Sequence, residues 1–205
     1  MLRLLFVGLL FCKLNAQNKR NLFWEANAFK AISLELPFAN TIVVSTTNSD
    51  QIHVKYLSEG EYQNHLVLRA KEEGQDLQLV EQQGPSFKNH HDKLSAHKVW
   101  ASSLRLLLPE GLPIQLKAEN AQLNLLGDFT HLSVALKEGK LSLSGQNVNG
   151  RVQTQKADVL LYGLENATRA QSKYGKVNGS FSSLEQCDLI IESVEGNISL
   201  LSDRK

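Results

Sequence analysis

The chain has little cysteine, no excess of either charge and no long apolar run, and each shortage excludes a class of protein. Its 205 residues include two cysteines, and one of them, Cys12, lies in a leader-like segment, so we predict no internal disulfide. The formal net charge of +1 argues against nucleic acid or an anionic membrane as the main partner. The apolar run 4–11 is far shorter than the ~20 residues of a membrane-spanning helix.

Helical periodicity and catalytic motifs are also missing from the sequence. No stretch beyond the first residues combines a 3.6-residue apolar period with capping residues, so we expect little or no helix. There is no Gly-x-Ser-x-Gly elbow, phosphate-binding loop or dinucleotide fingerprint. We therefore predict no catalytic residue, no cofactor and no enzyme activity. A carbohydrate-active enzyme is the least favoured alternative.

The first sixteen residues have the layout of a secretory signal peptide. Arg3 precedes the apolar run 4–11, and the small residue Ala16 precedes a polar segment. We predict cleavage after Ala16 and a secreted or periplasmic, cell-envelope location. Lipid attachment at Cys12 is the minor alternative, because the bulky Phe11 stands where lipoprotein signals carry a small residue.

Between Phe23 and Leu108 the sequence alternates apolar and polar residues in short runs separated by turn residues. This period of two predicts strands with one buried and one solvent-facing side. The predicted strands are 31–36, 41–46, 52–56, 65–69, 76–81 and 99–108. Their close spacing favours antiparallel hairpins in part of the region, and a long loop from Gly84 to Lys98 interrupts them.

The last 85 residues repeat one short phrase five times, most clearly as Gly139-Lys-Leu-Ser-Leu-Ser-Gly145. The first apolar residue of each phrase recurs after 18, 18, 18 and 21 residues. These residues are Leu123, Leu141, Val159, Val177 and Ile198. A period near 20 with one strand per repeat predicts a β-solenoid.

We expect the five phrases to stack in chain order as rungs ~4.8 Å apart. The first apolar residues of the phrases then form one inward column. A second inward column consists of Leu116, Val134, Val152, Ala170 and Ile191. Three glycines at phrase ends are expected to have positive φ. They are Gly127, Gly145 and Gly163.

These features resemble the adhesin-like β-strand-repeat family of bacteria, of the auto-transporter adhesin head-domain type. The resemblance rests on the leader, on the strand–turn–strand from Leu106 to Leu116 and on rungs such as 139–145, and it covers roughly residues 29–201. It implies a right-handed β-helix outside the cytoplasm and no catalytic residues. The rungs depart from the family in carrying Leu126, Leu160 and Tyr162 at outward positions.

The expected fold is therefore all-β, with a short right-handed single-stranded β-helix after a strand-rich, partly hairpin-like portion. The expected division is a signal peptide over 1–16, an N-terminal β-strand region over 17–110 and β-helix repeats over 111–205.

One outward column is the candidate binding face, because it mixes apolar or aromatic side chains with small polar ones. It consists of Leu126, Ser144, Tyr162, Ser180 and Leu201. The alternative is that another part of the chain packs over this column. Lys140, Asp158 and Lys176 share a neighbouring column, which we interpret as an exposed ion-pair ladder.

Two sets of chemically active side chains are interpreted as structural. His90, His91 and Asp92, with His97 nearby, are of the types that zinc or copper binds. Adjacent histidines do not readily face one ion, so we favour a solvated loop and predict no metal site. Cys187 is interpreted as a small packed residue in the wall of the repeats.

The expected function is non-enzymatic binding or surface adhesion, with a glycan or a surface protein as the partner. The alternative from another class is an envelope structural or signalling protein that self-associates or contacts a membrane protein. Self-association is expected through the C-terminal rung, because Ile198 and Leu200 would otherwise face an open end of the stack.

Overall fold

The computed structural model describes residues 18–59, 66–84 and 101–201, and within them the chain is all-β. One short 3-10 helix, η1 (Ala26–Ala28), accompanies fifteen strands that form one open sheet. The strands are β1 (Asn18–Glu25), β2 (Ala31–Leu36), β3 (Ala39–Thr47), β4 (Gln51–Glu59), β5 (Leu66–Glu73), β6 (Asp76–Gln83), β7 (Ala101–Pro109), β8 (Ile114–Leu126), β9 (Phe129–Ser144), β10 (Val148–Thr154), β11 (Asp158–Tyr162), β12 (Thr168–Ser172), β13 (Val177–Asn178), β14 (Leu189–Ser193) and β15 (Ile198–Leu201). The all-β prediction is confirmed for this part of the chain. None of its helices is long and apolar enough to cross a membrane.

Some predictions concern residues outside these ranges and stay predictions. They are the signal peptide over 1–16 with Cys12, and the metal candidates His90, His91, Asp92 and His97.

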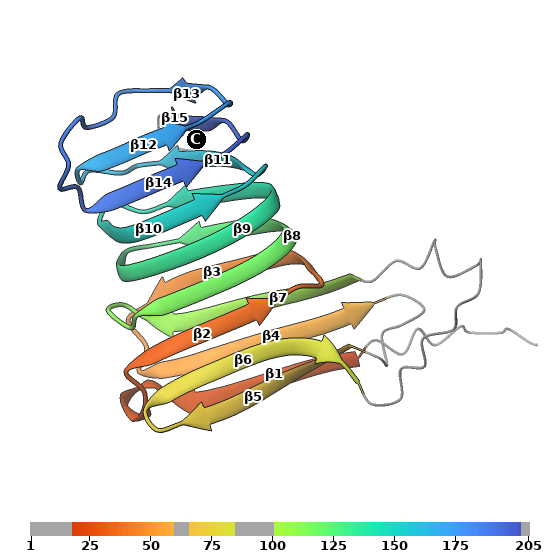
Figure 1. Cartoon of the computed structure of the whole chain (residues 1–205). Helices are drawn as coiled ribbons and strands as arrows, with labels where there is room; N and C mark the ends of the chain where they lie inside the picture. Colours follow the sequence, from red (N-terminus) through yellow and green to blue (C-terminus); the bar gives the residue numbers. More distant parts are fainter. Residues whose placement is uncertain (1–17, 60–65, 85–100, 202–205) are drawn as a thin grey trace, which may run out of the picture.

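The strands form two hydrogen-bonded ladders, and the long strands β8 and β9 belong to both. Ladder I runs β1-β4-β7-β3, then through the second halves of β8 and β9, then β11-β15-β13. Ladder II runs β5-β6-β2, then through the first halves of β8 and β9, then β10-β14-β12. Figure 1 shows the strands stacked along one axis, with β1 and β5 at one end and β12 and β13 at the other. Buried side chains of both ladders form a single hydrophobic core.

The first half follows the alternation in its sequence. In β4, Ile52, Val54 and Tyr56 are buried while the residues between them are partly or fully exposed. β5 and β6 form an antiparallel hairpin, as expected, with Gly74 at its turn at φ +64°. β1 is not among the predicted strands; it begins at Asn18 and pairs with β4 in antiparallel fashion.

In the repeats, the first three rungs pair in parallel with the expected offset of 18 residues. Leu123 pairs with Leu141, and Leu141 pairs with Val159, so the first inward column is confirmed here. Ladder II aligns the second inward column in the same way, through Leu116, Val134 and Val152.

The last two rungs are not stacked in chain order. Ile198 of β15 pairs with Val159 on one side and with Val177 on the other. In ladder II, β14 likewise lies between β10 and β12 (Figure 1). After the third rung, the chain forms the fourth rung at the far end of the stack. It then returns, and the fifth rung lies between the third and the fourth. The fourth and fifth phrases carry equivalent apolar residues, so either of them can pair with the third rung in the inward column. The expected order is therefore wrong.

This order corrects the expected role of the last rung in self-association. Ile198 is 0% exposed, and β15 has a neighbouring strand on each side. The end of the stack is formed by β12 and β13 instead. End-to-end pairing through Ile198 and Leu200 therefore has no structural basis.

Close packing at the corners explains the small residues that recur there. A Cβ added to Gly196 would lie 1.9 Å from the carbonyl oxygen of Ala157 on the neighbouring rung. Gly127 and Gly163 have the expected positive φ, at +103° and +66°. The expectation is wrong for Gly145, which is confined by close approach: its Cβ would lie 2.2 Å from the carbonyl oxygen of Gly127.

Candidate functional site

The candidate binding face lies on the outer side of ladder I, where cross-strand pairing tests the expected column. Leu126 pairs with Ser144, and Ser144 pairs with Tyr162. Tyr162 then pairs with Leu201 rather than with the fourth phrase, because β15 lies next to β11. Ser180 is exposed and lies in the connection after β13, outside the ladder. Four of the five expected residues are therefore aligned.

The aligned residues belong to a longer outward row, which we call the outer row. Leu126 pairs with Ser45, Ser45 with Leu107, Leu107 with His53, and His53 with Phe23. In spatial order, the outer row consists of Phe23, His53, Leu107, Ser45, Leu126, Ser144, Tyr162 and Leu201. Its eight strands span ~34 Å at the usual strand spacing. Within the described ranges, eight large apolar side chains are exposed, and four of them lie in this row.

An aromatic pair forms one end of the outer row. The rings of Phe23 and His53 stack with centroids 4.0 Å apart and an interplanar angle of 15°. Partial burial, together with the charge of Lys55, lowers the pKa of His53 below its ordinary value. Nε2 of His53 makes no hydrogen bond to any residue described. The lowered pKa favours the neutral ring, which extends the apolar surface of Phe23.

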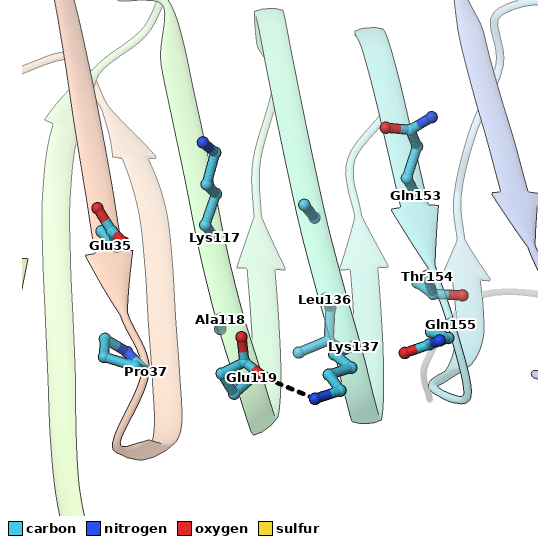
Figure 2. Close-up of a pocket in the computed structure, with 11 residues that line it drawn as sticks. Glu35, Pro37, Lys117, Ala118, Glu119, Leu136, Lys137, Gln153, Thr154 and Gln155 are labelled. Carbon is cyan, nitrogen blue, oxygen red and sulfur yellow. Dashed lines mark hydrogen bonds and ion pairs between the residues drawn. The ribbon is translucent and has the colours of Figure 1, made fainter.

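The outer side of ladder II carries two shallow depressions, and the smaller one holds paired charges. It encloses about 360 Å³ between outward side chains of β2, β8, β9 and β10 (Figure 2). Figure 2 shows the ion pair between Glu119 and Lys137, whose charged atoms are 3.1 Å apart. Both side chains are more than half exposed, so the pair contributes little to stability. Glu35 and Lys117 occupy adjacent positions across the same depression.

The larger depression, which we call the polar groove, encloses about 980 Å³ at the starts of five ladder II strands. Its lining comes from β6, β2, β8, β9 and β10 and includes His131. We did not predict this groove from the sequence. The groove draws on segments near residues 31, 76, 114, 132 and 150, none of which carries a recognisable motif by itself.

The column of Lys140, Asp158 and Lys176 is not the ion-pair ladder that we expected. Oδ1 of Asp158 accepts hydrogen bonds from the backbone N–H and side-chain amide of Asn197, at 2.8 and 3.1 Å. Oδ1 of Asn197 accepts one from the backbone N–H of Lys176, at 2.9 Å. Asn197 therefore separates Asp158 from Lys176, and the column satisfies backbone groups at a corner of the stack.

A buried carboxylate lies in the core of the N-terminal half. Glu81 is 2% exposed and accepts hydrogen bonds from the Tyr56 hydroxyl and the Phe38 backbone N–H, both at 2.8 Å, and from the Ser102 hydroxyl. Burial raises the pKa of Tyr56 well above its ordinary value, and the charge of Glu81 adds to this shift. Position 81 continues the inward series of Leu77 and Leu79 in β6. The alternation of apolar and polar residues in β6 could therefore have predicted an inward position for Glu81.

The remaining chemically active residues do not form a site. Cys187 is a free thiol in the connection between β13 and β14, and its Sγ lies 3.2 Å from the carbonyl oxygen of Leu184. Cys187 is half-buried in this connection and does not belong to a strand. The prediction that it packs in the wall of the repeats is therefore wrong. Within the described ranges, no three His, Cys, Asp or Glu side chains are close enough to hold a metal ion.

The fold and these surfaces define an all-β protein with an open sheet and two outward faces. Neither a known protein family nor a curated protein matches its sequence. A solved structure of a "putative cell adhesion protein" from Clostridium sporogenes is similar, with a TM-score of 0.59 and 17% identity over 92% of this chain and 100% of its own. A "putative adhesin" from Bacteroides fragilis has a TM-score of 0.35 and 9% identity, over 90% of this chain and 96% of its own. A "putative adhesin" from Parabacteroides merdae has a TM-score of 0.31 and 11% identity over the same shares. The similarity to the Clostridium protein shows a common fold.

Proposed function

We propose that this protein is a non-enzymatic, adhesin-like binding protein that works outside the cytoplasm and contacts a surface protein through the outer row. The outer row carries this proposal, because it gathers into one line four of the eight large apolar side chains that are exposed in the described ranges. Exposed apolar and aromatic side chains interspersed with small polar ones are typical of contact surfaces. The Clostridium protein with the same fold is named a "putative cell adhesion protein", which supports the same choice.

The proposal includes three features that rest on the sequence. Residues 1–16 are a cleaved signal peptide, which would export the protein to the periplasm or the exterior. The repeats over 111–205 form a right-handed β-helix, and the 18-residue register of parallel pairs supports this. Residues 17–110 form an N-terminal region that covers one end of the helix.

The size of the outer row favours a weak contact repeated over many copies. A strip one residue wide is ~7 Å across and ~34 Å long, which gives on the order of 240 Å². A stable interface needs about 800 Å² from each partner. A single copy would therefore bind weakly, while a surface carrying many copies would gain strength through simultaneous contacts. This behaviour suits adhesion better than a permanent complex.

Beads coated with the purified protein test the proposal in a multivalent form. The test variant is Leu107→Ser with Leu126→Ser, and the matched control is Leu184→Ser with Val194→Ser, which removes two exposed apolar side chains outside the row. Each lost contact costs on the order of 1 kcal/mol, so the test variant should weaken each single contact roughly 30-fold. Binding to intact cells should fall for the test variant alone and should require surface proteins that protease removes. Equal binding by both variants, or binding that survives protease, would contradict the proposal.

A further inference from the structure

The polar groove on ladder II is built from side chains that alternate in length along one wall. Cross-strand pairing aligns this wall in the order Gln78, Ser33, Gln115, Ser133 and Arg151. Serine is short, whereas glutamine and arginine are long, so notches fall at Ser33 and Ser133. These two positions are two strands apart, a distance of ~9.6 Å.

A second wall and a floor complete the groove. The second wall consists of residues at the strand starts, namely Asp76, Ala31, Pro113, His131 and Asn149. Ile32, Ile114 and Leu132 lie between the two walls, but their side chains are only 1–2% exposed and belong to the hydrophobic core, so the floor of the groove is strand backbone. Five strands give a groove ~19 Å long that runs along the axis of the stack.

Three of the five side chains of the first wall are available to a ligand, whereas the side-chain amide of Gln78 donates a hydrogen bond to Glu73 at 2.8 Å. Ser33, Gln115 and Ser133 make no side-chain hydrogen bond to any residue that the structure describes. The guanidinium of Arg151 lies 3.9 Å from the carboxylate of Glu192, and both side chains are about half exposed. A hydroxyl or amide group of this kind can both donate and accept hydrogen bonds.

The charge of the groove argues against strongly ionic ligands. Among the described residues that line it, Asp76 is the one carboxylate and Arg151 the one guanidinium, so their charges offset each other. A nucleic acid or a polyanionic chain would need a stripe of Lys and Arg. The donors and acceptors that remain are mostly neutral amides, hydroxyls and an imidazole.

The backbone of the groove argues against an extended peptide that adds a strand. Such binding uses the free N–H and C=O groups of a sheet edge. β6, β2, β8, β9 and β10 each have a paired strand on both sides, so their backbone groups already take part in the ladder. A ligand in the groove must therefore take its hydrogen bonds from side chains.

We propose that the polar groove binds an extended, uncharged oligosaccharide, whose hydroxyls bond to the polar side chains of the two walls. Such a chain is rich in groups that both donate and accept hydrogen bonds, and its extended form suits a groove ~19 Å long. The alternating notches would admit alternate sugar units along the chain. This site is independent of the outer row, so its failure would leave the proposed contact with a surface protein untouched.

Isothermal titration of the purified protein with linear hexasaccharides tests the inference. The probes are the neutral chains cellohexaose, xylohexaose, mannohexaose, laminarihexaose and chitohexaose, with hexagalacturonate as the anionic comparison. At least one neutral chain should bind, with an affinity that does not change when salt is raised. If all neutral chains fail at millimolar concentration, or if only hexagalacturonate binds, the inference is overturned.

Two variants place the binding in the groove. Gln115→Ala should weaken binding about fivefold, as the loss of one hydrogen-bonding group does. Gln122→Ala is the matched control, because it removes the same exposed side chain from the same strand, β8, on ladder I. Ser133→Leu fills a notch with an exposed side chain and should abolish binding without lowering the melting temperature. Binding that persists in Gln115→Ala and Ser133→Leu would overturn the inference, as would an equal loss in Gln122→Ala.

Discussion

Leu143→Ala tests the register of the stack through the core. Leu143 is 0% exposed and pairs with Leu125 on one side and Leu161 on the other, in the inward column of ladder I. Both flanking residues are also 0% exposed, so the site has little freedom to collapse around a smaller side chain. Buried Leu→Ala changes cost between 2 and 5 kcal/mol, and we expect about 3 kcal/mol here. This is a large part of the 5–15 kcal/mol that usually stabilises a domain.

Urea unfolding followed by circular dichroism measures this cost, and thermal unfolding gives an independent check. For a chain of this size, about 3 kcal/mol corresponds to a fall of roughly 9 °C in Tm. Gln122→Ala is the control, because Gln122 is exposed and faces outward, so its change should stay within about 0.5 kcal/mol. Ser142 is a poor control, since it is 5% exposed despite its outward position. A cost below about 1 kcal/mol for Leu143→Ala would refute the register.

Two further predictions concern carboxylates. Hydrogen bonds from the backbone N–H groups of Asn147 and Gln146 lower the pKa of Asp128, so this group stabilises the fold above its unfolded pKa of ~3.9 and loses that effect as pH falls. Urea unfolding should show Asp128→Asn to be less stable than the parent at pH 7, with a difference that shrinks towards pH 3; a constant difference would count against this. Tyr56→Phe removes one of the donors to the buried Glu81 and should cost about 1–3 kcal/mol in the same measurement. A neutral effect would mean that Glu81 does not depend on the Tyr56 hydroxyl.

The sequence predicts the columns of the repeats well because each column depends on local alternation. Leu123, Leu141 and Val159 occupy equivalent places in their phrases, and the spacing of 18 residues aligns them without further information. The order of the last two rungs could not be predicted in this way. Val177 and Ile198 are similar apolar residues, and either could pair with Val159 at the same place in the ladder.

The candidate surfaces show the same division between local and non-local information. Four residues of the binding face were predicted because they recur within the phrases. The other four residues, Phe23, His53, Leu107 and Ser45, join the row only because β1, β4, β7 and β3 pair in that order and β3 pairs with β8, which the sequence does not specify. The polar groove joins five distant segments for the same reason. Glu81 is different, since the alternation of β6 already placed it inward.

The last rung lies between the third rung and the fourth, which brings Leu201 beside Tyr162 in the outer row. Two engineered cysteine pairs test this order in a Cys187→Ser background. Leu160 pairs with Ser199, whereas Asn178 lies one strand further away. Neighbouring strands are ~4.8 Å apart, within the range that a disulfide can bridge, while two strands are ~9.6 Å apart and cannot be bridged.

Mass spectrometry after mild oxidation of the folded protein decides between the two orders. Leu160→Cys with Ser199→Cys should form an intramolecular disulfide, and Leu160→Cys with Asn178→Cys should remain reduced. A disulfide in the second pair but not in the first would show that the rungs stack in chain order, and would contradict the account.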